Sequence, residues 1–279
     1  MLRVHNLYTL LWSGWLHFPS SVRTLAYKVL RWIALKLRTR ESVNVIRLPF
    51  NLYAKYGRTV LRTEAFAMQY VAQHTTIPVP TILDLVEDNG GVFILMSRLP
   101  GQPLGITRDL NTMPSPQVLL FEIAMRDWLD QLRSLSPPNP DVVSGFDGGP
   151  CMSDRIKQEE FVGPFPSQRE FHQYLYHTVG KRHHNALRVI AAQSHGVPHR
   201  ICFESDIHPN NILVSRDGHL TGLIDWECAG WYPKYWEYTK TIYLRAGYAE
   251  WSAVFQRIFP QYENELMVEK AFWGVHNPW

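Results

Sequence analysis

The stretch ESDIHPNNILVSRDGHLTGLIDWE, residues 204–227, is the most informative part of the chain. Asp206 stands five residues before Asn211, and Asp225 follows two short apolar segments joined by an Arg-Asp-Gly turn. Such a turn returns the chain as a hairpin, which would set Asp225 opposite Asn211. Two carboxylates and an amide oxygen can together orient a hydroxyl group and bind a magnesium ion. The stretch therefore predicts a site of this kind.

The same residues also have a simpler interpretation. An aspartate close to a proline and an Asn-Asn pair commonly form turns that have no further role. This interpretation fits Asp225 less well, because an acidic side chain in the apolar segment LIDWE needs a partner or a cleft.

Composition limits the classes of protein to consider. The chain has 279 residues, of which 46% are apolar and 13% aromatic, which suffices for one large domain or two lobes. Its net charge of +3 includes no long run of one sign, so we do not expect a nucleic-acid partner. The three cysteines have neither disulfide-framework nor zinc-site spacing, which favours a reducing, cytoplasmic location. The sequence assigns no oligomeric state.

The hydrophobic pattern changes along the chain. Residues 43–98 read as short strands with a helix at 62–74 and a hairpin at the Asn-Gly pair 89–90. After residue 115 the pattern is mostly helical. We therefore expect an α+β protein with a small lobe at 43–98 and a larger helical lobe at 99–279, and we expect the aromatic WEYTK, residues 236–240, to belong to the core.

Residues 1–42 form an N-terminal segment ahead of these lobes. Its apolar part, residues 7–18, is too short to span a bilayer. Residues 21–38 predict an amphipathic helix, because Arg and Lys alternate there with apolar residues at helical spacing. We expect this helix to pack on its own domain through Leu25, Val29 and Ile33, with contact to an anionic membrane surface as the alternative.

Several further words carry a resemblance to a known family. They are DIHPNNILV at 206–214, GLIDWECAGWYPKYWEY at 222–238, IPVP at 77–80 and ILMSRLPGQPL at 94–104. From about Val43 onward the chain resembles the aminoglycoside phosphotransferase and choline kinase-like family, in particular its fungal members of unassigned substrate. The resemblance implies a protein kinase-like two-lobe fold with the active cleft between the lobes. It also implies ATP or GTP as phosphate donor, Mg²⁺, and a small hydroxylated molecule as acceptor.

The same resemblance assigns roles to individual residues. Asp206 corresponds to the catalytic aspartate, and Asn211 and Asp225 to the metal ligands. Lys55 stands where the phosphate-contacting lysine belongs, with Glu64 as the partner that orients it. The nucleotide base is expected at the backbone of the segment between the lobes, which comprises Met96, Ser97, Arg98 and Leu99.

The chain departs from the family pattern in two places. A Gly-rich loop is missing, and only RLPFN, residues 47–51, joins the first strands. The family commonly has a histidine two residues before its catalytic aspartate, whereas this chain has Glu204. A carboxylate there could raise the pKa of Asp206 by repulsion, or could instead bind the loop backbone or the acceptor. His208 could likewise cap the loop or touch the acceptor.

These departures leave two functions open. The first is a small-molecule O-phosphotransferase, and the second is a pseudokinase-like protein that binds nucleotide without turnover. The helix expected at 21–38 adds a third class, a membrane-surface protein that uses this helix as its anchor. The acceptor is expected to contact residues 146–171, where Asp154, Glu159 and Glu160 could meet a cationic molecule or form a solvated face.

Overall fold

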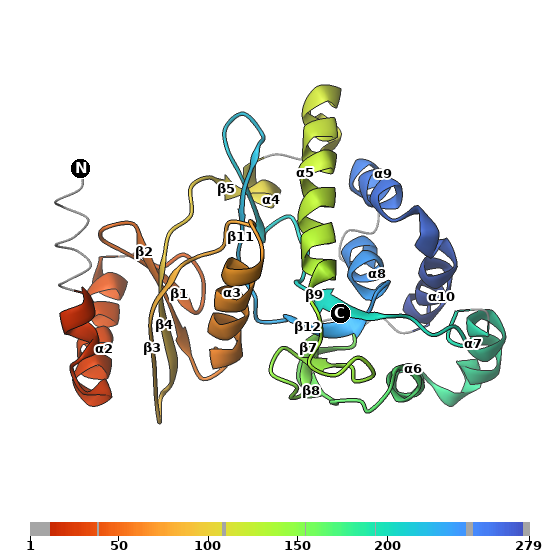
Figure 1. The fold of residues 1–279 in the computed structure, drawn as a ribbon, viewed down its shortest axis with the longest axis horizontal. Helices are drawn as coiled ribbons and strands as arrows, with labels where there is room; N and C mark the ends of the chain where they lie inside the picture. The colour runs from red at the N-terminus through yellow and green to blue at the C-terminus, as the bar shows by residue number, and fades with distance from the viewer. Residues whose placement is uncertain are drawn as a thin grey trace. The chain divides into compact units, whose positions relative to one another are not determined.

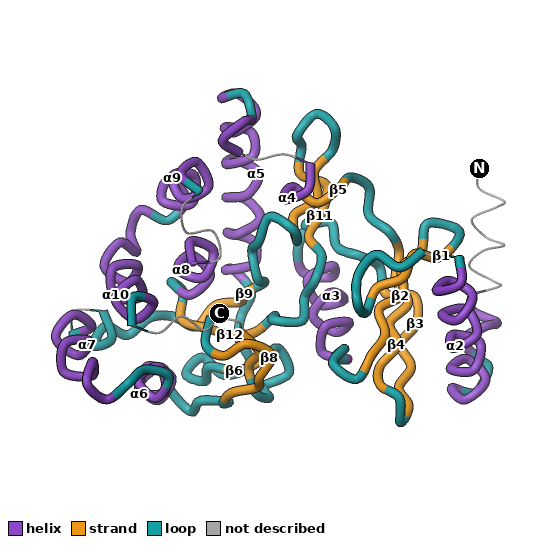
Figure 2. The backbone as a smooth tube through the Cα atoms, turned by 180° about the vertical axis from the view of Figure 1, so that it is seen from behind, coloured by secondary structure: helices purple, strands orange, loops and turns teal. Residues whose placement is uncertain are grey.

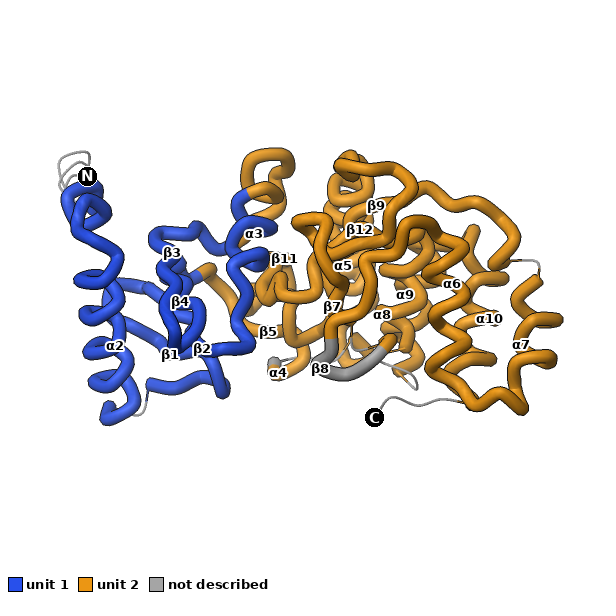
Figure 3. The backbone as a smooth tube through the Cα atoms, turned by 90° about the horizontal axis from the view of Figure 1, so that it is seen from below, with its two compact units in different colours: residues 1–69, 80–98 blue, residues 70–79, 99–279 orange. Residues whose placement is uncertain are grey.

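The computed structural model describes residues 12–37, 39–107, 110–153, 155–192, 194–243 and 248–275. The chain divides into two compact units, shown in different colours in Figure 3. The first unit comprises Met1–Gln69 and Pro80–Arg98, and the second comprises Tyr70–Val79 and Leu99–Trp279. The short segment 70–79 groups with the second unit because its backbone bonds there. One example is the N–H of Leu223, which donates to the carbonyl of Pro78 at 3.0 Å.

The first unit is built on a four-stranded antiparallel sheet. The strand order is β1-β2-β4-β3, with β1 at Val45–Leu48, β2 at Leu52–Gly57, β3 at Ile82–Asp88 and β4 at Gly91–Ser97. The β3–β4 turn requires Gly91, whose φ is +124° and whose added Cβ would lie 2.2 Å from the carbonyl of Gly57. The register of this hairpin therefore follows from its turn residues.

Two helices cover opposite faces of this sheet: α2 (Ser20–Lys36) and α3 (Arg62–His74) (Figures 1 and 2). Side chains alternate along β4, so Phe93 and Leu95 join the core under α2 while Val92 and Ile94 join the core under α3. Each face of the sheet is thereby removed from water.

Helix α2 packs through a different face from the one predicted. The expected stripe of Leu25, Val29 and Ile33 is exposed, at 65%, 49% and 40% of each residue's surface. The buried side is that of Tyr27, whose ring stacks on Phe93 with centroids 4.4 Å apart. The stripe prediction is therefore wrong, although the helix does pack on its own unit.

The orientation of α2 has a polar cause. Asp84 on β3 is buried under the helix, and a buried carboxylate needs hydrogen-bond donors. Arg23 and the hydroxyl of Tyr27 both bind it. Turning Leu25 and Val29 toward the sheet would remove these donors, so the buried acid selects the polar side of the helix.

The second unit is mainly helical. Its helices are α4 (Leu104–Thr107), α5 (Ser115–Ser134), α6 (Gln168–His177), α7 (His184–Ala191), α8 (Trp236–Tyr243), α9 (Ala249–Ile258) and α10 (Glu263–Trp273). Helix α8 packs against α9 and α10, and α5 packs against α9 (Figure 1). Among the described residues, no helix is long and apolar enough to cross a membrane.

Short antiparallel strands complete this unit. They are β5 (Gln102–Pro103), β6 (Ser144–Gly145), β7 (Cys151–Ser153), β8 (Lys157–Val162), β9 (Ile201–Glu204), β10 (Ile212–Val214), β11 (Leu220–Leu223) and β12 (Gly230–Pro233). Strand β10 lies between β11 and β5, β12 lies between β6 and β9, and β7 pairs with β8. A small sheet followed by a mostly helical part agrees with the α+β prediction.

An aromatic core holds α8 in the second unit. Trp236 is fully buried, meets Phe171 edge-on with centroids 4.9 Å apart, and lies parallel to Tyr232 on β12. The first turns of α8 are therefore anchored beside β9 and β12.

Candidate active site

The loop after β9 brings Asp206 and Asn211 together. The side-chain amide of Asn211 donates to the Asp206 carboxylate at 3.3 Å and to the Asp206 carbonyl at 3.2 Å. The loop is closed by the backbone N–H of Asn211, which donates to the carbonyl of His208. Asp206 has a φ of +65°, a left-handed conformation that non-glycine residues adopt mainly where the fold requires it.

The β10–β11 hairpin places Asp225 next to this loop. Ile212 pairs with Leu223, and the N–H of Ile224 donates to the carbonyl of Asn211 at 2.9 Å. Asp225 also has a left-handed backbone, with a φ of +64°. The hairpin expected from the Arg-Asp-Gly turn is therefore present. Its second strand brings Asp225 back beside Asn211.

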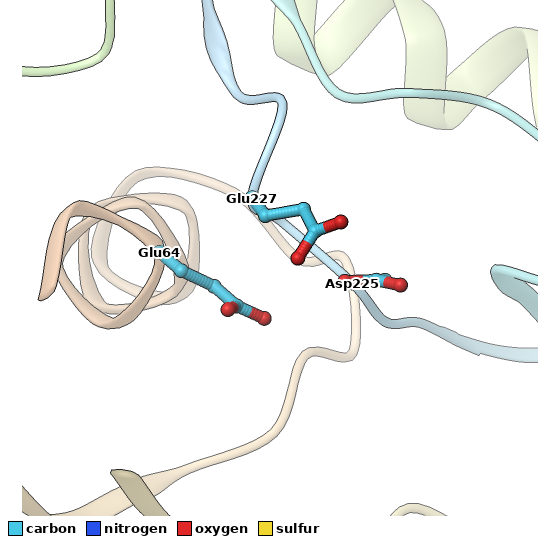
Figure 4. A group of neighbouring side chains, drawn as sticks. All are labelled: Glu64, Asp225 and Glu227. Atoms are coloured by element: carbon cyan, nitrogen blue, oxygen red, sulfur yellow. The ribbon is translucent and has the colours of Figure 1, made fainter. Parts of the chain in front are cut away.

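A third acidic residue, which the sequence analysis did not single out, follows Asp225. Asp225 and Glu227 leave the same loop, and a carboxylate oxygen of one lies within 4.8 Å of an oxygen of the other (Figure 4). Two carboxylates and the Asn211 amide give oxygen donors of the type that Mg²⁺ prefers. The spacing Asp-x-Glu at the end of an apolar segment was the available sequence signal.

A buried lysine joins the loop to helix α8. The Nζ atom of Lys240 lies 2.9 Å from Glu204 and 2.9 Å from Asp206. Glu204 also accepts a hydrogen bond from the backbone N–H of Asp206 at 3.2 Å. Of the three roles considered for Glu204, binding of the loop backbone is the one observed. We call Glu204, Asp206 and Lys240 the buried triad.

Burial and charge act against each other within the buried triad. Burial raises the pKa of Glu204, and the nearby ammonium of Lys240 opposes this rise. Burial alone would lower the pKa of Lys240, but the carboxylates of Asp206 and Glu204 outweigh it and hold that pKa well above its ordinary value. Lys240 is therefore a cation, placed between the two acids.

Glu237, one turn before Lys240, holds the backbone of the same loop. Its carboxylate accepts the N–H groups of Ser205 at 2.8 Å and Ile207 at 3.0 Å. Both residues belong to WEYTK, which the sequence analysis assigned to the core. That assignment holds for the aromatic residues but missed these two. A glutamate and a lysine three residues apart in an apolar helix were the signal.

The first unit contains the predicted pair of Lys55 and Glu64. Lys55 on β2 lies 3.1 Å from one oxygen of Glu64 and 3.0 Å from the other, and both residues are buried, at 6% and 2% exposure. The alternatives in which Lys55 is a solvated strand residue and Glu64 is an exposed helix residue are therefore excluded. The lysine is held by α3, as its assigned role requires.

The expected base-binding segment begins on β4. The N–H of Ser97 donates to the carbonyl of Thr81, and the N–H of Arg98 to that of Asn51. Met96 pairs with Tyr53 and Ile82 inside the sheet and is largely buried. Ser97 and Arg98 thus already use their N–H groups, which leaves their carbonyls as the groups for a base.

The remaining predicted residues lie as follows. The ring of His208 accepts the N–H of Asn210 at 3.3 Å, so it caps the loop. Asp154 and the side chains of Glu159 and Glu160 lie outside what the structure describes.

Comparison with known proteins places the sequence in a family. The sequence model described as "Phosphotransferase enzyme family" matches residues 58–272. The chain belongs to this family.

Solved structures similar to this phosphotransferase-family chain agree on the fold. Aminoglycoside phosphotransferase APH(4)-Ia aligns with a TM-score of 0.58 at 15% identity, over 89% of each chain. A thermostable mutant of it, in ternary complex with AMP-PNP and hygromycin B, gives 0.57 at 15% identity, covering 84% of this chain and 82% of that one. The GDP and kanamycin complex of APH(2")-IIia gives 0.55 at 10% identity, covering 88% and 86%. The predicted kinase-like α+β fold is confirmed.

A curated relative of this family member comes from a fungus. "Clavilactone A biosynthesis cluster protein Y" of Ampulloclitocybe clavipes is 24% identical over 195 residues, which are 59% of this chain. The match spans about half the length of that relative, 48%.

Proposed function

We propose that the chain transfers the γ-phosphate of ATP to a hydroxyl group of a small molecule, with Asp206 as the catalytic residue. One observation carries this proposal. Within the buried triad the side chain of Asp206 is 17% exposed, whereas those of Glu204 and Lys240 are 2% and 1% exposed. Asp206 is thus the triad residue that an acceptor can reach.

The contacts of Asp206 suit a proton acceptor. Lys240 holds one carboxylate oxygen, and the amide of Asn211 contacts the other. Such a carboxylate has a defined orientation and can hydrogen-bond an acceptor hydroxyl, then take its proton as the phosphoryl group moves. The family's commoner histidine is replaced here by Glu204, whose charge Lys240 compensates. The pseudokinase alternative therefore gains no support from this replacement.

Magnesium is the ion that fits the donor set beside Asp206. The amide nitrogen of Asn211 faces Asp206, so its oxygen is the group for a metal, together with the carboxylates of Asp225 and Glu227. Mg²⁺ bound there would neutralise charge on the nucleotide phosphates. Lys55, oriented by Glu64, is proposed to contact the α and β phosphates. The carbonyls of Ser97 and Arg98, between Met96 and Leu99, are proposed to contact the base.

The nucleotide and the acceptor classes follow from the relatives' own ligands. The complexes of similar proteins contain AMP-PNP, hygromycin B, GDP and kanamycin, so ATP is the proposed donor and GTP the alternative to test. The acceptor is proposed to be a small polyhydroxylated or amino-alcohol-like molecule.

The decisive experiment measures ATP consumption across a panel of hydroxylated metabolites with wild type and Asp206→Asn. We expect turnover in the wild type to fall by at least about a hundredfold in the variant, while Mg-ATP binding stays within about twofold, because Asp206 faces the acceptor.

Asp217→Asn is the matched control, because Asp217 is exposed in the β10–β11 turn. It should retain wild-type turnover. A wild type that binds Mg-ATP but consumes no more of it than Asp206→Asn on every panel member would identify a nucleotide-binding pseudoenzyme instead.

A further inference from the structure

The side of α2 turned away from the sheet forms a continuous apolar surface. Its members lie three or four positions apart along the helix, opposite Tyr27 and Ala34, and Trp32 is 62% exposed. We call this surface the outer face of α2, and it comprises Val22, Leu25, Val29, Trp32 and Ile33. Five large apolar side chains exposed on one side of a helix form the kind of contiguous patch that marks an interaction surface.

The charged residues of the N-terminal segment are all basic. Residues 1–40 contain seven Lys and Arg and no Asp or Glu, whereas the remaining 239 residues contain 21 basic and 25 acidic ones. Arg23 and Lys28 are paired with acids of β3. Within the described part of the chain, Arg31, Lys36 and Arg40 form no ion pair, so their charges are available to a partner.

A basic hollow lies at the C-terminal end of α2. It has a volume of about 90 Å³ and is lined by Arg31 and Arg40 together with Leu35, Ile46 and Tyr56, with no acidic side chain among its lining residues. The guanidinium of Arg31 lies 4.6 Å over the ring of Tyr56, and Arg40 is held by the carbonyls of Ser42 and Val43. The hollow lies between α2 and the sheet, so it is separate from the outer face of α2.

We propose that the outer face of α2 binds the surface of an anionic phospholipid membrane. The apolar side chains would enter the acyl boundary, with Lys36, which lies on the same side of the helix, against the lipid phosphates. A bilayer surface offers hydrocarbon and negative charge side by side, which matches the apolar outer face of α2 and Lys36 on the same side of the helix. The seventeen-residue helix lies along such a surface rather than across it. The proposal does not depend on the phosphotransferase activity.

Co-sedimentation of the full chain with vesicles tests this proposal. Phosphatidylcholine vesicles are compared with vesicles in which part of the lipid is phosphatidylserine. We expect binding to the anionic vesicles, weaker binding to the neutral ones, and a decrease as salt rises.

Two variants locate the contact. Leu25→Glu with Val29→Glu should reduce binding at least about tenfold, because charges would enter the acyl boundary. Lys36→Gln should reduce binding to anionic vesicles by about fivefold and leave the binding to neutral vesicles unaffected.

The matched control is Leu119→Glu with Ile123→Glu on α5, where these residues are 56% and 57% exposed. This variant should bind vesicles like the wild type. All variants should keep the wild-type melting temperature.

Three results would overturn the proposal. The first is an absence of vesicle binding by the wild type. The second is unchanged binding by the Leu25/Val29 variant. The third is a wild-type dimer without lipid that the same variant converts to monomer, which would show that a second copy covers the outer face of α2.

Discussion

Lys240 is buried between two carboxylates, and this arrangement explains how the chain can carry Glu204 near its proposed catalytic residue. Two acids close together repel each other, and burial strengthens that repulsion. Lys240 supplies the opposite charge at 2.9 Å from both Glu204 and Asp206. The acid and the lysine therefore act as one unit, and neither is expected to tolerate replacement alone.

Lys240→Met tests this dependence. The substitution leaves Glu204 and Asp206 without their shared cation, so we expect a loss of about 3–5 kcal/mol in the free energy of unfolding. The turnover number should fall more than the KM for ATP changes, because the lost contact orients the catalytic carboxylate. Urea unfolding and steady-state kinetics measure the two effects.

A double variant and a surface control complete the test. Glu204→Gln with Lys240→Met should cost less stability than the sum of the single changes, since the repulsive charge is also removed. Lys270→Met, on the exposed side of α10, should stay within about 0.5 kcal/mol of wild type. Additive losses in the double variant would show that Glu204 and Lys240 do not interact.

At the scale of elements, the second unit is held partly by buried histidines. His172 on α6 stacks on His195, with centroids 4.0 Å apart and planes 11° apart. Burial, together with the neighbouring His195 and His199, lowers the pKa of His172 to about 3. Burial, together with His199, which faces Glu265 on α10, lowers the pKa of His195 to about 4. Both rings are therefore neutral in the folded protein at neutral pH.

These pKa values predict loss of stability in acid. Above pH 6.5 neither folded nor unfolded chains protonate the rings, so the full stability is present. As the pH falls below that value, the unfolded chain binds protons that the folded chain does not, and stability is lost down to the folded pKa values. One pKa unit corresponds to about 1.4 kcal/mol, so the loss is on the order of a few kcal/mol. Urea unfolding between neutral pH and about pH 4 measures it.

His195→Phe separates this contribution from other titrating groups. Both ring nitrogens of His195 are buried and have no hydrogen-bond partner among the described residues, so phenylalanine keeps the stack without losing a bond. We expect neutral-pH stability to be kept and the acid-induced loss to shrink. An unchanged pH dependence would assign the loss to the carboxylates.

At the scale of the whole molecule, each of the two compact units contains residues that are proposed to bind a ligand. Lys55 and Glu64 belong to the first, and Asp206, Asn211 and Asp225 belong to the second. A ligand that binds only the folded chain stabilises it, so nucleotide binding can be measured as a rise in melting temperature.

Asp225→Asn should remove most of this rise. At about 100 times its Kd, Mg-ATP should stabilise the wild type by about 2.7 kcal/mol, or roughly 5–10 °C in a chain of this size. The variant has lost a charged metal ligand, so its shift should be less than about half as large, with an unchanged melting temperature in the absence of nucleotide. Thermal scans with ATP or GTP, with and without Mg²⁺, measure this and identify the donor.

Two results would contradict the metal assignment. A variant stabilised by Mg-ATP as strongly as the wild type would exclude Asp225 as a ligand. A wild-type shift of the same size without Mg²⁺ would exclude the metal from nucleotide binding.

Much of the site could be predicted from the sequence because its geometry is local. The five-residue spacing of Asp206 and Asn211 and the hairpin before Asp225 involve neighbours along the chain, whose positions follow from turn chemistry. The same holds for Lys55 and Glu64, which occupy a strand and the helix directly after it. The sequence segments that resemble the family also predicted the fold, because they span most of the chain.

Other features depended on contacts between distant residues. Lys240 reaches Glu204 across 36 positions, and Glu237 reaches Ser205 across 32. The face of α2 that is buried was chosen by Asp84, 57 positions after Tyr27. Local periodicity marks which residues are apolar, but a buried charge far along the chain decides which side of a helix faces inward, since an unpaired buried acid costs more than exposed leucine side chains.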